Sequence, residues 1–240
     1  MISLRTLRVL TFVSPQSWKK GGVGKRGISK MVCLVFAFCI ASAIGSSAQY
    51  EAPIYSFCSQ AGCADGIWPG GLVQATDGNF YGTTSEGGAN STCDPPYGCG
   101  TVFKITSAGE LTTLHTFNWT DGAYPFGGLL QATDGTFYGI TPDGGAKDNS
   151  SGTVFSLSVG LGPFVETLPT SGRVGAKVII LGTDLTGATS VAFNGTAAKF
   201  EVVSKSEIET DVPSGATSGT VEVKLAKNTL KSNVVFRVTK

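Results

Sequence analysis

The sequence predicts an all-β protein, and three observations support that prediction. The 240 residues include 33 glycines and ten prolines, and only 15% of them are charged. Runs of β-branched and aromatic residues alternate with Asp-Gly and Gly-Gly turns, which favours short strands over helices. The third observation is an internal duplication, because QATDGNFYGTT at Gln74–Thr84 recurs as QATDGTFYGIT at Gln131–Thr141. Such a duplication predicts two copies of one β-unit.

Each copy contains four strand-like runs, so we expect two four-stranded units within residues 49–160. The expected strands are Ile54–Phe57, Gly71–Ala75, Asn79–Thr83 and Thr101–Thr106 in the first unit, and Leu111–Phe117, Leu129–Ala132, Thr136–Ile140 and Thr153–Ser158 in the second. Asp77-Gly78 and Asp134-Gly135 are each expected to form a two-residue hairpin turn with positive φ at both positions. The Gly87-Gly88 and Gly144-Gly145 pairs are expected where the backbone reverses after the next strand.

Residues 162–240 have a different composition, with fewer aromatic residues and turn signals every eight to twelve residues. This rhythm is typical of an immunoglobulin-like β-sandwich. Most of its strand-like runs alternate apolar with polar residues, as half-buried strands do. These runs are Lys177–Thr183, Ser190–Gly195, Ala198–Ser204, Glu207–Pro213, Gly219–Leu225 and Asn233–Thr239.

Residues 1–48 are expected to be a signal peptide with a long basic n-region. The basic stretch Lys19–Lys30 precedes the apolar run MVCLVFAFCIASAI at Met31–Ile44, and small residues then predict cleavage between Ala48 and Gln49. The run of 14 residues is too short for a helix across a hydrocarbon core of about 30 Å. We therefore expect no transmembrane segment in the mature chain and a secreted or cell-surface location. A permanent anchor and a later start, such as Met31, are the alternatives.

The charge of the chain is unevenly distributed. Residues 1–48 hold seven basic residues and no acidic one, and residues 49–240 hold 11 basic and 17 acidic residues, a net charge of −6. Residues 49–161 alone carry two lysines and ten acidic residues, a net charge of −8. This balance argues against a nucleic-acid partner, which needs a dense basic surface.

Four cysteines remain after the expected cleavage. The short spacings CSQAGC and CDPPYGC favour a Cys58–Cys63 and a Cys93–Cys99 disulfide. A zinc site is the alternative, but the spacings are not C-x-x-C and the single histidine, His115, has no partner motif.

Residues suited to catalysis are few, so we expect neither an enzyme nor a bound cofactor. His115 lies in an ordinary strand position, and no hydrolase, metalloprotease or phosphate-binding motif is present. Acidic residues recur in pairs, which would suit glycoside hydrolysis or calcium binding. Most of them lie beside glycines, where Asp is favoured for turn formation. The pairs are Asp65 with Asp121, Asp77 with Asp134 and Glu86 with Asp143.

Aromatic residues near the expected loops are the candidate ligand-binding residues. Exposed rings beside Asp and Asn could stack on sugar faces. The competing interpretation is core packing, since Trp68 and Tyr124 occupy equivalent repeat positions before proline. The candidates are Trp68, Tyr81, Trp119, Tyr124 and Tyr138.

The repeat motif P-x-G-G-L-x-Q-A-T-D-G-x-F-Y-G-x-T-x-x-G-G followed by G-T-V-F resembles the GloVer tandem repeats of surface and secreted bacterial proteins, over about residues 54–158. Four strands per unit also suit a propeller blade, but propellers need about four blades or more. Two units therefore leave three hypotheses: docking on the C-terminal domain, self-association through unpaired repeat faces, or a fragment of a longer array.

Residues 162–238 resemble the IPT/TIG family of immunoglobulin-like domains. Glycines at 172, 175 and 182, the Phe193–Gly195 turn and Val212-Pro213 come in the expected order. The resemblance implies a spacer or binding unit and brings no catalytic residue. We therefore expect display, adhesion or binding of an extracellular glycan or protein ligand. A carbohydrate-binding accessory module and a fragment of a polysaccharide-active hydrolase are the rival hypotheses.

Overall fold

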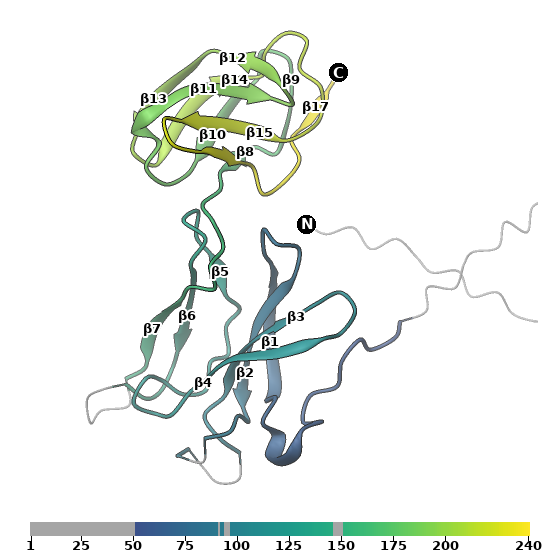
Figure 1. Ribbon diagram of the computed structural model, residues 1–240, viewed down its shortest axis with the longest axis vertical. Helices are drawn as coiled ribbons and strands as arrows, with labels where there is room; N and C mark the ends of the chain where they lie inside the picture. The colour runs from purple at the N-terminus through teal and green to yellow at the C-terminus, as the bar shows by residue number, and fades with distance from the viewer. Residues whose placement is uncertain (1–50, 91, 94–96, 146–150) are drawn as a thin grey trace, which may run out of the picture. The chain divides into compact units, whose positions relative to one another are not determined.

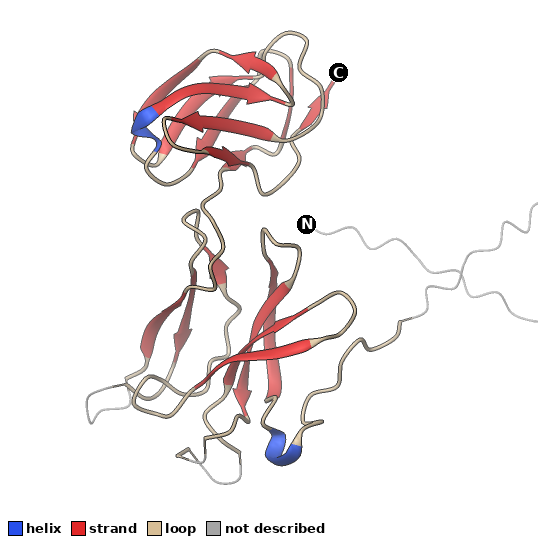
Figure 2. Cartoon of the chain, in the orientation of Figure 1, coloured by secondary structure: helices blue, strands red, loops and turns tan. Residues whose placement is uncertain are grey.

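The computed structural model describes residues 51–90, 92–93, 97–145 and 151–240, and in these the all-β prediction is confirmed (Figures 1 and 2). The only helical elements described are two single turns, η1 (Ala61–Cys63) and η2 (Leu185–Gly187). No described helix is long and apolar enough to cross a membrane. The expected signal peptide lies outside the described residues.

The first repeat forms a four-stranded antiparallel sheet in the order β1-β2-β3-β4. Its strands are β1 (Ile67–Gln74), β2 (Phe80–Glu86), β3 (Thr101–Ile105) and β4 (Leu111–Thr116). Two expectations about this sheet were wrong. Ile54–Phe57 is not a strand, and the strand at 111–116 belongs to the first sheet although its sequence begins the second repeat. The fourth strand of the sheet therefore comes from the following repeat.

The second repeat forms a three-stranded sheet instead of the expected four-stranded one. Its strands are β5 (Leu130–Gln131), β6 (Phe137–Thr141) and β7 (Thr153–Leu157), in that order. After β7 the chain continues into the C-terminal strands, so no third repeat supplies a fourth strand to this sheet.

The Asp-Gly hairpins have three loop residues instead of the two that the sequence predicted. In the first unit the amide of Gly78 donates to the carbonyl of Ala75. The amide of Ala75 in turn donates to the carbonyl of Asn79. Only the glycine has positive φ, 81° at Gly78 and 91° at Gly135. Asp77 keeps an ordinary φ because its carboxylate accepts the amide of Asn79 at 3.1 Å. This is the type I turn with a glycine bulge that three-residue hairpins favour.

A threonine pair, fully buried in the first unit and partly buried in the second, fixes the same strand register in both units. The hydroxyls of Thr84 and Thr101 lie 2.8 Å apart in the first unit, and those of Thr141 and Thr153 lie 2.9 Å apart in the second. In each unit the first threonine also accepts the backbone amide of the second. A buried hydroxyl must find a partner, so the repeated threonines specify this pairing.

The two repeat units share one hydrophobic core. The Tyr81 ring stacks on Phe137 with ring centres 4.4 Å apart, and Phe117 meets Phe155 edge to face at 5.1 Å. Thr83 donates to the carbonyl of Gly127 at 2.8 Å. One face of the first sheet is thus covered by the second unit.

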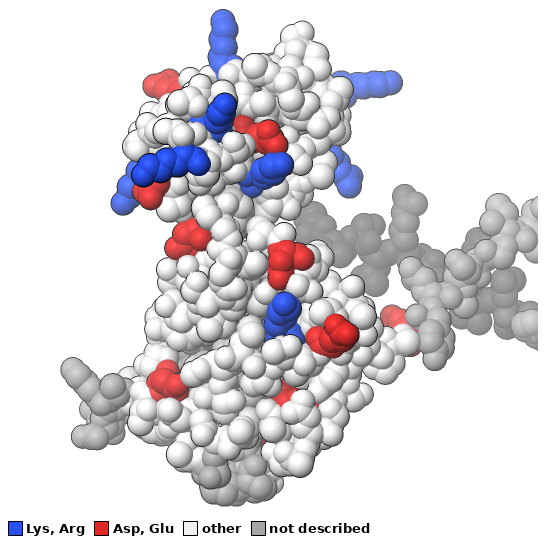
Figure 3. Space-filling model, in the orientation of Figure 1, with Lys and Arg blue, Asp and Glu red and all other residues white. Residues whose placement is uncertain are grey.

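The C-terminal strands build a sandwich of two four-stranded sheets, ordered β13-β14-β10-β8 and β12-β11-β15-β16, with a short parallel pair β9-β17. Their bounds are β8 (Glu166–Leu168), β9 (Ser171–Arg173), β10 (Lys177–Leu181), β11 (Ala188–Phe193), β12 (Thr196–Ala198), β13 (Phe200–Ser204), β14 (Glu207–Asp211), β15 (Val221–Leu225), β16 (Thr229–Lys231) and β17 (Arg237–Thr239). Inward residues of both sheets form one core around Phe193 and Phe236. Figure 3 shows that basic side chains gather on these strands and are sparse on the repeats.

Candidate functional site

A buried carboxylate, Asp65, organises the loop that leads into β1. It accepts the Tyr55 hydroxyl at 2.7 Å, the Ser59 amide and hydroxyl at 3.0 Å each, and the Gln60 amide at 3.3 Å. Burial raises the pKa of Asp65, but these hydrogen bonds outweigh it and hold the pKa below the ordinary value. The carboxylate is saturated by the loop, which is a structural role.

The second unit repeats this arrangement with different side chains. His115 Nε2 lies 2.9 Å from Asp121 Oδ2, and the amide of Asn118 donates to Asp121 Oδ1 at 3.0 Å. His115 thus takes the place of Tyr55, and Asp121 that of Asp65. The Asp121 side chain is 38% exposed, so this copy of the loop is more open to solvent.

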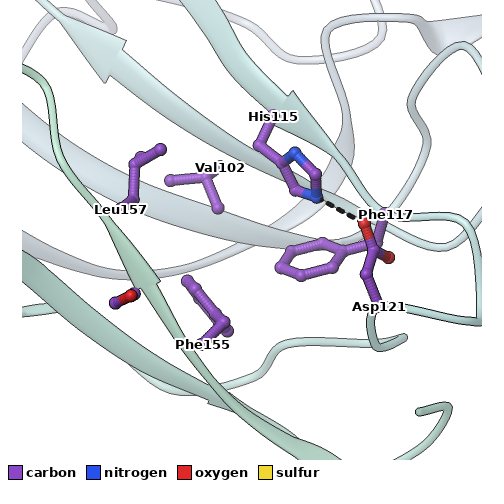
Figure 4. A pocket seen from close by; sticks show the side chains of 7 residues that line it. Val102, His115, Phe117, Asp121, Phe155 and Leu157 are labelled. Carbon is purple, nitrogen blue, oxygen red and sulfur yellow. Dashed lines mark hydrogen bonds and ion pairs between the residues drawn. The ribbon is translucent and has the colours of Figure 1, made fainter. Parts of the chain in front are cut away.

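A small cavity of about 190 Å³ opens beside the His115–Asp121 pair. Figure 4 shows the imidazole of His115 pointing at Asp121, with the rings of Phe117 and Phe155 lying along the cavity. The lining comes from β3, β4 and β7 together with the loop after β4. The pocket therefore exists only because the two repeat units pack together.

The cavity holds a histidine and a carboxylate, but its geometry does not complete a nucleophile-base arrangement. Ser156 also lines it, yet none of the hydrogen bonds among the described residues joins Ser156 to His115. A nucleophile and its base must lie within hydrogen-bond reach. Within the same part of the chain, no cluster of three or more His, Cys, Asp or Glu could hold a metal ion.

The pair Asp77 and Asp134 lies in the hairpin turns, whereas Glu86 ends β2 and Asp143 follows β6. Asp77 accepts the Asn79 side chain at 2.7 Å and the Tyr81 hydroxyl at 3.0 Å, while Asp134 accepts the amide of Thr136 at 2.8 Å. Burial raises the pKa of Asp77, but the hydrogen bonds from Asn79 and Tyr81 lower it by more. The pKa of Asp77 therefore lies below its ordinary value. These contacts assign both residues to turn formation.

Tyr81 makes the fold sensitive to alkali. Burial, together with the bond to Asp77, raises the pKa of Tyr81 to about 12. A folded-state pKa above the unfolded value of about 10 stabilises the protein below pH 10, and that contribution is lost as the pH rises toward 12. We expect the free energy of unfolding to fall by roughly 2 to 3 kcal/mol over this interval.

The Tyr81→Phe variant is the test of this titration. Urea unfolding at pH 8 and at successive steps up to pH 12 should show a smaller loss in the variant than in the wild-type protein. Equal pH dependence in both proteins would assign the alkaline loss to other groups.

The candidate aromatic residues fall into different environments. Trp68 in β1 is 69% exposed, whereas Tyr81 is only 1% exposed and its ring is stacked in the repeat core. Tyr81 lies in the strand expected near the Asp-Gly turn, and its ring packs in the repeat core, where a surface ligand does not reach it. Trp119 and Tyr138 are 37% and 38% exposed, and Tyr124 is partly buried with its ring 6.2 Å from that of Trp119.

The backbone holds three of these residues in the left-handed region. Trp68 and Tyr124, at equivalent repeat positions, have φ of 56° and 59°, and Trp119 has φ of 71°. Bulky residues adopt this conformation only where the surrounding structure imposes it. The Trp68 ring is therefore presented to solvent from a constrained backbone.

Two exposed aromatic residues were missed by the sequence analysis. Phe126 is 67% exposed and Tyr97 is 53% exposed. Phe126 is an extra residue in the second repeat, because YPFGG stands where the first repeat has WPGG. This single insertion was the signal that could have identified it.

Both expected disulfides are present, joining Cys58 to Cys63 and Cys93 to Cys99. The first closes the loop around η1, next to Asp65, and the second lies in the repeat core with both cysteines buried. Disulfides are typical of an extracellular environment.

Comparison with protein-family models identifies two regions. The model described as Gloeobacter/Verrucomicrobia repeat matches residues 43–199, and the IPT/TIG domain model matches residues 164–238. Both resemblances noted in the sequence are thus confirmed. No curated protein matches the chain at a significant level.

Similar solved structures are distant. A surface glycan-binding protein, PbSGBP-B from Prevotella bryantii, is 18% identical over 35% of this chain and 19% of its own, with a TM-score of 0.26. A fungal alcohol oxidase of the AA5 family, in complex with copper, is 14% identical over 72% of this chain and 41% of its own, also with a TM-score of 0.26. The chain spans less than half the length of either protein. Likenesses this weak carry no argument about function.

Proposed function

Because the chain belongs to the Gloeobacter/Verrucomicrobia repeat family and carries an IPT/TIG domain after its repeats, we propose that it is a secreted, non-enzymatic adhesion module. The combination of repeat and IPT/TIG domains fits a surface or adhesion role. In this proposal residues 1–48 direct export, residues 49–160 form the ligand-binding repeat part and residues 162–240 form the immunoglobulin-like unit.

One observation supports binding by the repeat part, namely the exposed tryptophan in β1. The Trp68 side chain is 69% exposed on a backbone that is paired with β2 and held at positive φ. A large aromatic ring carried on a constrained backbone gives binding area at little entropic cost. Such rings are enriched among the residues that dominate binding energy.

We propose a carbohydrate as the ligand. The repeat part is acidic and rich in Gly and Thr, so it carries many groups that can bond sugar hydroxyls. Sugars present apolar faces for stacking and hydroxyls for hydrogen bonding. A protein ligand at the same tryptophan is the competing version.

Glycan arrays with the purified chain, followed by calorimetry on any retained glycan, test this proposal. We expect Trp68→Ala to weaken binding at least tenfold, which corresponds to about 1.4 kcal/mol, while leaving thermal stability nearly unchanged because the ring is exposed. Val174→Ala, an exposed apolar truncation in the C-terminal domain, should bind like the wild-type protein. If no glycan is retained, the carbohydrate version is wrong.

The hydrolase alternative is tested on the same glycans. Release of reducing ends that is abolished by Asp77→Asn or Asp134→Asn would overturn the non-enzymatic assignment. We expect no release, since both carboxylates bind turn residues.

A further inference from the structure

The second sheet leaves one apolar face uncovered. Alternate residues of its three strands point away from the repeat core and are 38% to 78% exposed. A shallow cavity of about 450 Å³ lies over this face. We call this apolar face of the second sheet the outer face, and its residues are Leu130, Tyr138, Ile140 and Val154.

The equivalent face of the first sheet is covered by protein. Its residues at the matching repeat positions are Val73, Tyr81, Thr83 and Val102, and the last three are each only 1% exposed. They are covered by the second unit, through the Tyr81–Phe137 stack and the bond from Thr83 to the Gly127 carbonyl. A surface of this kind therefore already accepts a repeat unit within the chain.

The edge of the second sheet is open in the same way. In the first sheet β3 pairs with β4 on the side away from β2, with Thr101 opposite Thr116 and Val102 opposite His115. The matching strand β7 pairs with β6 alone among the described residues. A strand edge without a partner is a template for another strand.

The segment Ile54–Phe57 has the contacts of a fourth strand but no partner strand. It matches Leu114–Phe117 in the repeat alignment. Phe57 meets Phe103 at 5.0 Å as Phe117 meets Phe155 at 5.1 Å, and Tyr55 bonds Asp65 as His115 bonds Asp121. The segment is thus placed against its own unit as β4 is placed against the second unit, and Ile54 remains 57% exposed.

We propose that a second copy of this chain docks head to tail on the outer face. Its first repeat unit would cover the outer face as the second unit covers the first sheet. Its Ile54–Phe57 segment would add to β7, with Ser56 opposite Thr153 and Tyr55 opposite Val154, following the register of β3 and β4.

The chain itself presents the surface that this docking requires. Leu72 of the first unit is 59% exposed, whereas its equivalent Leu129 in the second unit is 7% exposed within the shared core. The first unit therefore displays the apolar side chain that the second unit uses to bind its neighbour. This identifies another copy of the chain as the occupant of the outer face. Contacts of this head-to-tail kind close into rings or extend as fibres.

Complementary variants of the full chain test the proposal. Ile140→Lys with Val154→Lys blocks the outer face, and Ile54→Lys with Leu72→Lys blocks the opposite end. All four side chains are at least 57% exposed, and circular dichroism with thermal melting verifies folding. Should either double variant fail to fold, Val154→Lys and Ile54→Lys replace them as single changes.

Sedimentation velocity at increasing concentration gives the readout. We expect the wild-type chain to associate, each variant alone to remain monomeric, and an equimolar mixture of the two variants to form a one-to-one dimer through the one intact pair of surfaces. A wild-type chain that stays monomeric at the highest concentration at which it remains soluble would overturn the proposal. So would variants that still associate alone, or a mixture that stays monomeric. Glycan binding through Trp68 is measured separately, so either proposal can fail without the other.

Discussion

Replacing Asp65 with alanine is expected to lower the free energy of unfolding by about 3 kcal/mol, one of the two largest effects that we predict for this chain. The change removes four hydrogen bonds from a fully buried carboxylate and leaves the Tyr55 and Ser59 hydroxyls and two backbone amides without their acceptor. Hydrogen bonds to a charged group contribute about 1.5 to 3 kcal/mol each, and water replaces part of this at the exposed Ser59 and Gln60. Urea unfolding at pH 7 measures the difference.

The repeat supplies the matched control for this change. Asp121→Ala removes the equivalent carboxylate, which is 38% exposed and accepts from His115 and one amide, so we expect a loss of about 1 kcal/mol. Equal losses at the two positions would contradict the assignment of Asp65 as the buried organiser of its loop.

The stabilising contribution of Asp65 should also depend on pH in the acid range. The pKa of Asp65 is lowered in the folded protein, so its contribution is present above the unfolded value of about 3.9 and is lost as the pH falls through the folded value. We therefore expect the difference between wild-type and Asp65→Ala to shrink below about pH 4.

Truncating Phe137 to alanine is expected to cost about 3 to 5 kcal/mol, the range for a fully buried phenylalanine. The ring is 0% exposed and stacks on Tyr81 at the junction of the two repeat units. The substitution would leave a cavity in the core that both units share, so the unfolding midpoints of the two units should fall together. Differential scanning calorimetry and urea unfolding both measure this loss of stability.

Phe80→Ala is the control for this truncation, because Phe80 holds the equivalent repeat position and is only partly buried. At a low protein concentration, where chains do not associate, its cost should be about half that of Phe137→Ala or less. Similar costs for the two phenylalanines would mean that the units do not depend on each other through Phe137.

Local sequence patterns predicted the parts of the fold that local forces decide. The turn glycines, the disulfides between neighbouring cysteines and the runs of the C-terminal sandwich depend on residues close in sequence. Positive φ at Gly78 and the Cys58–Cys63 bond are of this kind. The hairpin loop length was missed, because the Asp77 side chain stabilises its own turn with an ordinary φ.

The candidate site was less predictable, since burial depends on contacts between repeats. Tyr81 and Tyr138 have nearly identical neighbours in sequence, yet one is 1% exposed and the other 38%. Only the packing of the second unit on the first makes this difference. The repeat alignment showed that Tyr55 and His115 are equivalent. Only the structure showed their hydrogen bonds to Asp65 and Asp121.

The sequence by itself determined the all-β class, the repeat family, the C-terminal immunoglobulin-like domain and the cysteine pairs, because strand periodicity, turn residues and short loops record these features in adjacent positions. The tertiary structure decided that β4 completes the first sheet, that the second sheet keeps an open edge, and which of two equivalent aromatic residues faces water. These outcomes come from strand pairing and face packing between segments that are far apart in the chain, and such contacts leave no periodic signal in the residues that make them.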